Sequence, residues 1–180
     1  MNIFVVDENP KIAAQQLCNK HVVKMILESA QMLCSAFESG EAPYKRSYYN
    51  HPCTKWVRES QANYEWLLVH AYELCEEYLL RYGKIHKSLD AIDWCDNNSH
   101  KLGLDQELGL TPFAQAMPNE YKNDDVVQAY RDYYNGEKAY FAKWTTNTGS
   151  SLAHIAAPEW FKKGEVVELA DTTDLKSVEH

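Results

Sequence analysis

One face of a predicted helix is polar although the rest of the helix is apolar, and it carries His21, Lys24, Glu28 and Gln31. Steps of three, four and three residues bring these side chains into line, because a helix turns by about 100° per residue. A helix that is apolar nearly all round is normally buried, and ionisable groups in a core are costly unless they are paired or line a wet cleft. The spacing therefore predicts that His21, Lys24 and Glu28 line one pocket. The alternative is an internal network that only fixes packing.

These residue types indicate acid–base or nucleophilic chemistry. A carboxylate beside a cation can act as an acid or a base, or stabilise a cationic sugar intermediate, and Glu28 is the candidate for this role. An unprotonated amine can attack a sugar carbon and form a Schiff base. Lys24 is a candidate nucleophile, because burial and the nearby Lys20 would disfavour its charged form. His21 would orient groups or shuttle a proton.

Residues 41–58, which we call the basic-aromatic loop, hold four cations against a single acid, Glu41. This gives the loop a charge of +3 in a chain of net charge −8, so the remaining residues carry −11. Cations bind phosphates, and flat rings stack on unstacked bases. The predicted nucleic-acid contacts are Lys45, Arg46, Tyr48, Tyr49, His51, Lys55 and Arg58. In the alternative interpretation, the rings cover an edge of the core and the cations are simply solvated.

Helical periodicity dominates the chain. It predicts three long helices and one shorter helix, over Pro10 to Ser39, Ser60 to Tyr82, Asp124 to Trp144 and Ser88 to Asn97. Residues 2–6 are predicted to be extended. The expected fold is all-α, a compact single-domain bundle of three long helices with a short extended N-terminus. Gly136 would cost about 1 kcal/mol relative to Ala inside a helix, so we expect another residue to approach the backbone there.

The length of 180 residues suits one domain, which we place at residues 1–163. Residues 164–180 have no helical stripe and no aromatic residue, and they resemble the translation of a bacterial leucine tRNA gene, so we expect a disordered tail. No apolar run approaches the roughly 20 residues of a membrane span, and no secretory signal is visible. Five widely spaced cysteines without a C-x-x-C pair fit reduced thiols in a cytoplasmic protein.

Two metal-dependent alternatives rest on weaker patterns. A zinc site could draw its ligands from Cys18, His21, His51 and Cys53. An all-α nucleotide pyrophosphohydrolase could hold Mg²⁺ through Glu73, Glu76, Asp90 and Asp93. We favour the interpretation without a metal or cofactor.

The order of these features resembles that of the phage-type pyrimidine-dimer DNA glycosylases of the endonuclease V kind. In that family a Q-H step on the first long helix is followed seven residues later by the catalytic glutamate. Here Lys20-His21 is followed seven residues later by Glu28, and the segments 63–83 and 129–144 correspond in order and length. The resemblance covers about residues 1–145. The strings at residues 19–25 and 50–53 also resemble those of small phage proteins without an assigned activity.

The resemblance implies a DNA glycosylase whose nucleophile is the α-amino group of a processed N-terminal residue. Asn2 is not small, so we expect Met1 to be retained and its amine to be the second candidate nucleophile. The family flanks its glutamate with arginines, whereas this chain has Leu27 and Gln31.

We therefore predict a phage-encoded enzyme of the host cytoplasm that binds DNA. It would be a glycosylase, with or without lyase activity, acting on damaged or modified pyrimidines. The alternatives are the Mg²⁺-dependent hydrolase and a non-enzymatic phage accessory protein that binds nucleic acid or a host protein.

Overall fold

The computed structural model of the chain describes residues 1–148 and 155–162. Within these residues the structure is helical, with no β-strand, so the all-α prediction is confirmed for this part of the chain. The α-helices are α1 (Pro10–Gln16), α2 (Asn19–Cys34), α3 (Pro52–Val57), α4 (Gln61–Tyr82), α5 (Leu89–Asn98) and α6 (Val126–Glu137). Two short 3-10 helices cover Ser99–Lys101 and Asn119–Tyr121. The predicted tail, residues 164–180, lies outside the described residues.

The predicted first helix, Pro10 to Ser39, is wrong as a single element. Asn9 caps α1 as expected, and Pro10 occupies its first turn. The chain then leaves the helical conformation at Leu17 and Cys18, whose ψ angles are 141° and 163°. A second helix, α2, starts at the next residue and carries the polar stripe.

Arg81 of α4 explains this break. Its guanidinium, which is fully buried, donates to the carbonyl oxygens of Gln15 at 2.9 Å and Leu17 at 2.8 Å. A continuous helix would use those carbonyls for its own backbone bonds. The N–H of Cys18 donates instead to the hydroxyl of Tyr134 at 2.9 Å. Tertiary partners therefore replace the helical hydrogen bonds, which sequence periodicity cannot show.

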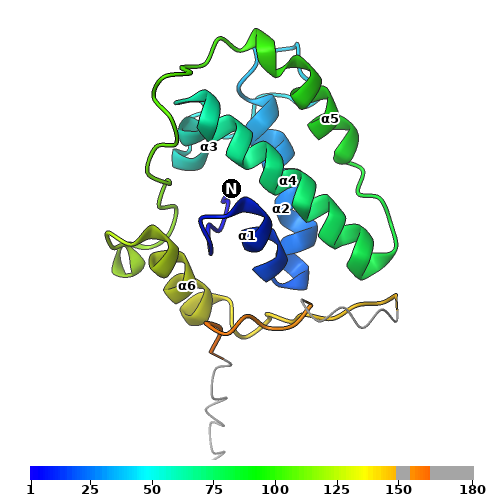
Figure 1. Cartoon of the computed structure of the whole chain (residues 1–180), viewed down its shortest axis with the longest axis vertical. Helices are drawn as coiled ribbons and strands as arrows, with labels where there is room; N and C mark the ends of the chain where they lie inside the picture. Colours follow the sequence, from blue (N-terminus) through cyan, green and yellow to red (C-terminus); the bar gives the residue numbers. More distant parts are fainter. Residues whose placement is uncertain (149–154, 163–180) are drawn as a thin grey trace, which may run out of the picture.

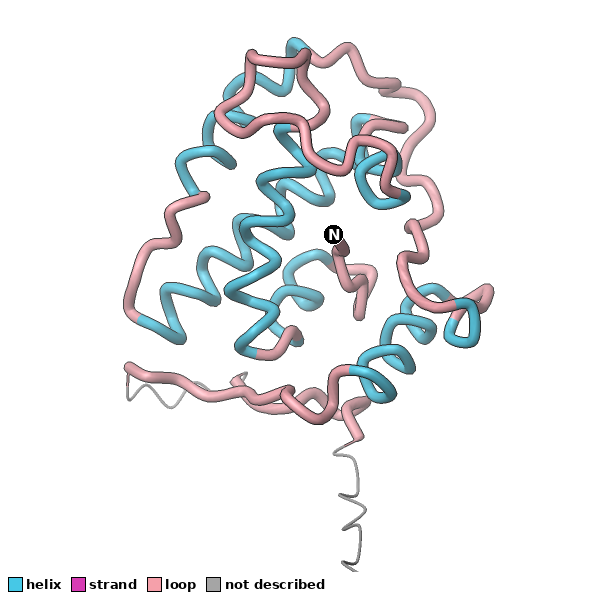
Figure 2. Tube along the Cα trace, turned by 180° about the vertical axis from the view of Figure 1, so that it is seen from behind, coloured by secondary structure: helices cyan, strands magenta, loops and turns pink. Residues whose placement is uncertain are grey.

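The longest helix, α4, has nearly the bounds that were predicted, and it contacts α1, α2, α3 and α5. Ser60 caps its start by accepting from the N–H of Asn63, and Gly83 ends it with a φ of +66°. Helix α4 packs against α1 and α2, and α5 packs against α2 and α4. In Figures 1 and 2 the N-terminus lies in the middle of the molecule, with these helices on one side and α6 on the other.

The last helix is shorter than predicted. Helix α6 ends at Glu137 instead of Trp144, so the expectation of three long helices is not confirmed. The chain continues along the start of α2, where the N–H of Asn19 donates to the Lys143 carbonyl at 2.8 Å and the Trp144 indole donates to the Gln16 carbonyl at 3.0 Å. These contacts fasten residues beyond α6 to the beginning of α2.

The close approach expected at Gly136 is present. A methyl group at this position would lie 2.9 Å from two ring carbons of Tyr121. The Tyr121 hydroxyl donates to Glu137 at 3.3 Å, which holds the ring over the helix backbone. The absence of a side chain at Gly136 therefore makes room for the Tyr121 ring, although glycine has a lower helix propensity than alanine.

This contact predicts a sign change in a double-mutant cycle. Gly136→Ala alone should lower the free energy of unfolding by about 1 kcal/mol, because overpacking costs about 1–3 kcal/mol and exceeds the gain in helix propensity. In a Tyr121→Ala background the same change should raise the free energy of unfolding by about 1 kcal/mol. Urea unfolding of the four proteins measures the cycle, and equal stabilisation in both backgrounds would contradict the contact.

Candidate active site

The first residues of the chain are buried and held in place by Asn2. Its side-chain amide donates to the Ala116 carbonyl at 2.7 Å, and its side-chain oxygen accepts from the N–H groups of Ile3 and Phe4 at 2.8 and 3.2 Å. Phe4 has a φ of +59°, a conformation that side chains other than glycine rarely adopt. The N-terminal segment therefore bends sharply and stays fixed against the loop that precedes α6.

Glu28 of α2 meets this segment. The N–H of Asn2 donates to Glu28 Oε2 at 2.8 Å, and the Met1 α-amine lies 3.6 Å from the same oxygen. Lys24 Nζ lies 3.4 Å from the other oxygen, Oε1. The side chains of Met1 and Glu28 are only 1% and 10% exposed. A buried carboxylate needs such partners, because an unpaired charge in the interior is costly.

These groups open into a cavity of about 420 Å³, a size in the range of small-molecule sites. The prediction that His21, Lys24 and Glu28 share a pocket is confirmed, and Met1 joins them. The cavity is lined by Met1, Asn2, Phe4, Lys20, His21, Lys24, Met25, Glu28, Ala116, Tyr133, Lys138 and Phe141. Gln31, the fourth residue of the stripe, lines a neighbouring cavity of about 490 Å³ with Leu27 and part of the basic-aromatic loop. The catalytic roles of the stripe residues stay predictions.

Lys24 differs from the expectation in one respect. Its side chain is 67% exposed, so the burial that would favour an unprotonated amine is missing. The ammonium lies at the mouth of the cavity and pairs with Glu28 from outside. The Met1 amine lies beside the other oxygen of the same carboxylate, and its own side chain is buried.

His21 is buried among aromatic rings. Its ring stacks on Phe4 with 4.3 Å between centroids, and Tyr134 and Phe141 present their edges to it at 5.1 and 5.4 Å. Burial, together with the positive charges of Lys138 and Lys24, lowers the pKa of His21 from 6.5 to about 3. Its buried Nδ1 has no hydrogen-bond partner among the described residues. His21 is therefore a neutral imidazole at physiological pH.

Eight lining residues were absent from the predicted site: Asn2, Phe4, Lys20, Met25, Ala116, Tyr133, Lys138 and Phe141. Phe4 stacks between His21 and Tyr133, whose ring is nearly parallel to it at 6.0 Å. Tyr133 and Phe141 lie within the helix predicted over residues 124–144, but helical periodicity alone indicates only core packing for such rings. No local pattern places residues 4 and 133 together.

His51 was predicted to contact nucleic acid, and the structure places it at the start of α3. Its Nδ1 accepts from the N–H of Cys53 at 3.2 Å and caps α3. Burial lowers the pKa of His51, the Met1 amine lowers it further, and Glu28 acts in the opposite direction. His51 therefore serves as the cap of α3 and does not line the Glu28 cavity.

The basic-aromatic loop divides into internal and exposed cations. Arg46 and Arg58 cover the Tyr49 ring, with guanidinium carbons 4.6 and 3.4 Å from its centroid. Arg46 also donates to the Phe37 carbonyl and lies 3.5 Å from Glu38. Lys45 and Lys55 are exposed. Tyr48 is 68% exposed, with a φ of +49°. The loop therefore presents Tyr48 and two lysines to solvent, while its arginines hold the loop together.

The metal-dependent alternatives gain no support from the geometry. The described residues contain no group of three or more His, Cys, Asp or Glu side chains placed to share an ion. Glu73 pairs with Lys11 at 3.4 Å, and Asp93 accepts from the Tyr72 hydroxyl at 2.9 Å. Two of the four acids of the Mg²⁺ alternative therefore have other partners.

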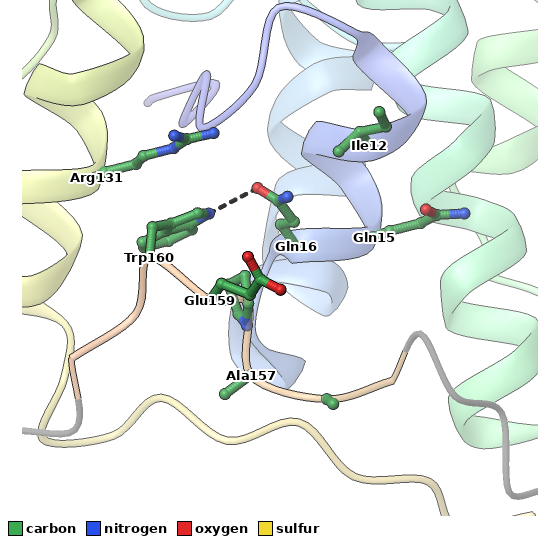
Figure 3. A pocket seen from close by; sticks show the side chains of 9 residues that line it. Ile12, Gln15, Gln16, Arg131, Ala157, Glu159 and Trp160 are labelled. Atoms are coloured by element: carbon green, nitrogen blue, oxygen red, sulfur yellow. Dashed lines mark hydrogen bonds between the residues drawn. The ribbon is translucent and has the colours of Figure 1, made fainter.

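A separate cavity of about 470 Å³ lies between α1, α6 and residues 156–160 (Figure 3). The Trp160 indole donates to the Gln16 side chain at 2.8 Å across it. Its cation, Arg131, donates to the Val6 carbonyl at 2.9 Å and lies 3.5 Å from Asp7. Arg131 thus fixes the N-terminal segment at Val6 and Asp7. None of the predicted site residues lines this cavity.

Comparison with known proteins places the chain in a family. Residues 1–91 match the family model described as pyrimidine dimer DNA glycosylase, so the chain belongs to this family. The matched region contains Met1, His21, Lys24, Glu28 and the basic-aromatic loop. The search of curated proteins and the search of solved structures returned no match. Among the described residues, no helix combines the length and the apolar character needed to cross a bilayer.

The burial of His21 predicts a specific loss of stability in acid. The folded state binds a proton on His21 less tightly than the unfolded chain does, because the folded pKa is about 3 and the unfolded pKa is 6.5. The neutral ring therefore stabilises the fold fully above pH 6.5, and this contribution is lost as the pH falls from 6.5 towards 3.

Between pH 7 and pH 5 the wild-type protein should lose about 2 kcal/mol more unfolding free energy than His21→Phe, which keeps an aromatic ring and cannot titrate. Urea unfolding at the two pH values measures this difference. His70 is also buried, but it is present in both proteins, so its contribution to the loss of unfolding free energy cancels in the comparison. Equal losses would mean that His21 titrates normally in the folded state.

Proposed function

We propose that this chain is a DNA glycosylase that excises a damaged pyrimidine with the Met1 α-amine as nucleophile and Glu28 as the catalytic carboxylate. One observation carries the proposal: the amine and the carboxylate lie 3.6 Å apart at the edge of a cavity, and both side chains are buried. The family supports DNA as the substrate and a pyrimidine dimer as the first lesion to test.

The reaction starts with attack of the unprotonated Met1 nitrogen on C1′ of the damaged nucleotide. The bond between C1′ and the base nitrogen breaks, and the base leaves with the bonding electron pair. The sugar ring then opens at the bond between C1′ and O4′. The two amine protons end on the departing base and on O4′, and the product is a Schiff base between the Met1 nitrogen and C1′. Such a Schiff base acidifies the protons on C2′, so elimination of the 3′ phosphate, a lyase step, can follow.

Met1 is a better candidate nucleophile than Lys24. An α-amino group gives up its proton more readily than a lysine side chain does. The buried Met1 side chain anchors the amine, whereas the Lys24 side chain is 67% exposed. Asn2 fixes the direction of approach, because its backbone N–H is bound to Glu28 and its side chain to Ala116.

Glu28 can act on charge that develops during the reaction. Its carboxylate is positioned beside the nucleophile before the substrate arrives, so it can stabilise positive charge on the sugar without reorganising. Lys24 balances the carboxylate in the resting enzyme. His21 has a pKa of about 3 and stays neutral, so it is a weak base, and its unpartnered Nδ1 suits it to orienting a group by a hydrogen bond better than to shuttling a proton.

The target nucleotide must leave the base stack to reach this cavity. The basic-aromatic loop adjoins it, since Lys45 and Arg46 share the neighbouring cavity with Leu27 and Gln31 of α2. The exposed Tyr48 ring can stack on an unpaired base, and Lys45 and Lys55 can hold backbone phosphates. The loop would therefore bind the duplex while α2 presents the reactive groups.

Borohydride trapping tests the reaction. With a duplex containing an abasic site, the wild-type protein should form a covalent adduct, because borohydride reduces the Schiff base to a secondary amine. Peptide mapping by mass spectrometry should locate the adduct on Met1. Glu28→Gln keeps the shape of the side chain and removes its charge, and it should reduce excision of a pyrimidine dimer by a factor of about 10² or more.

Two controls separate chemistry from folding. Lys24→Gln should still give an adduct on Met1, and an adduct lost in this variant would assign the nucleophile to Lys24. Thermal melting shows whether Glu28→Gln is folded, and the activity is compared per folded molecule. A folded Glu28→Gln protein with full activity, or a wild-type protein that forms no adduct on any abasic duplex, would refute the proposal.

The loop predicts different effects for its lysine and its tyrosine. Lys45→Ala should weaken binding similarly on all sequences and reduce the slope of log K against log salt by about one. Tyr48→Ala should leave the slope unchanged and weaken binding to single strands by about 1–3 kcal/mol. Fluorescence anisotropy between 50 and 200 mM salt measures both quantities. Binding that is independent of salt would exclude phosphate contacts by this loop.

A further inference from the structure

Three lysines surround the mouth of the Glu28 cavity, and two of them have no acidic partner. Lys20 and Lys24 come from α2, and Lys138 follows the last residue of α6. Glu28 is the one acid among the lining residues, and it is already paired with the Met1 amine and Lys24. Lys20 and Lys138 make no ion pair within the described residues, so their charges remain uncompensated at the cavity.

Aromatic rings hold both of these ammonium groups at the cavity. Lys20 Nζ lies 4.8 Å from the centroid of Phe141, and Lys138 Nζ lies 4.6 Å from the centroid of Tyr133. Both rings are themselves part of the cavity wall. A cation–π contact attracts the charge without using an anion. The two ammonium groups are therefore held in place and still able to bind an anion.

The two sides of this wall are tied together. The backbone bond from Asn19 to Lys143 and the bond from the Asn19 side chain to Thr145 join the start of α2 to the segment after α6. Three of the first four N–H groups of α2 already have acceptors, because that of Asn19 donates to the Lys143 carbonyl and those of His21 and Val22 donate to the Cys18 carbonyl. An anion at this place would therefore be bound by the lysine side chains and not by the helix end.

We propose that Lys20 and Lys138 bind the DNA backbone phosphates that flank the nucleotide whose sugar enters the cavity. This inference rests on the proposed function, because the Met1 amine must reach C1′ of that nucleotide. Each sugar in a DNA strand has a phosphate on both its 5′ and its 3′ side, so phosphates lie close to the reacting C1′. Clustered positive charge at a cleft attracts this polyanionic backbone.

This arrangement gives the enzyme basic contacts on both sides of the reacting group. The basic-aromatic loop lies toward the Gln31 end of the polar stripe, and the Lys20–Lys138 pair lies toward the other end. Lys20 and Gln31 are about 16 Å apart along the axis of α2, at about 1.5 Å per residue. Lys138 also lies outside the region matched by the family model, residues 1–91.

Binding can be measured separately from chemistry. The probe is a duplex with a tetrahydrofuran abasic analogue, which has no hydroxyl at C1′ and cannot form a Schiff base. Lys20→Gln and Lys138→Gln should each weaken binding by about tenfold at low salt and reduce the salt slope by about one. Lys101→Gln is the matched control, since it removes one charge from an exposed lysine that does not line the cavity, and it should bind like wild type. Lys138→Arg keeps the charge and should restore binding.

The outcomes separate this inference from the function on which it rests. If wild type forms the borohydride adduct but Lys20→Gln and Lys138→Gln bind the analogue as Lys101→Gln does, the phosphate contacts are refuted and the glycosylase remains. If wild type forms no adduct, the proposed function fails. Thermal melting of each variant shows that it is folded, and weak binding by a folded Lys138→Arg protein would overturn the electrostatic role.

Discussion

The burial of the Glu28 carboxylate is the constraint on which the rest of the site depends. A charged group at this depth requires donors, and the chain supplies them from its own first two residues. To do so, residues 1–6 must enter the interior and turn there, which places Phe4 in a left-handed conformation and covers His21 with its ring. One ionised side chain thus determines where the N-terminus lies, which ring covers the histidine and which oxygen faces the amine.

A second buried charge makes this geometry possible. Arg81 binds the carbonyls of Gln15 and Leu17, so the chain between α1 and α2 changes direction, and Tyr134 binds the N–H of Cys18. The polar stripe of α2 therefore faces the N-terminal segment and α6. Arginine suits this position because its planar group offers several donors in fixed directions.

The sequence predicted the helical fold, the extent of α4 and the pocket shared by His21, Lys24 and Glu28, because each depends on local periodicity. It failed where distant groups compete with the helix. The break at Leu17 depends on Arg81, more than sixty residues away, and the early end of α6 coincides with contacts from residues 143 and 144 to the start of α2. The burial expected for Lys24 was wrong for a similar reason: the side chain extends to the cavity mouth, and helical position alone does not show depth. Phe4, Tyr133 and Lys138 join the site only through tertiary structure.

The order of synthesis adds a consequence to the central position of the N-terminus. Met1 is synthesised long before Phe141, and the cavity wall is complete only when Phe141 has been made. At a synthesis rate of about 5–20 residues per second, the interval between Met1 and Phe141 is on the order of ten seconds. During that time no partial chain contains both the carboxylate environment and the aromatic wall. The complete pocket beside the Met1 amine therefore forms only after residue 141 has been made, in one late step of synthesis.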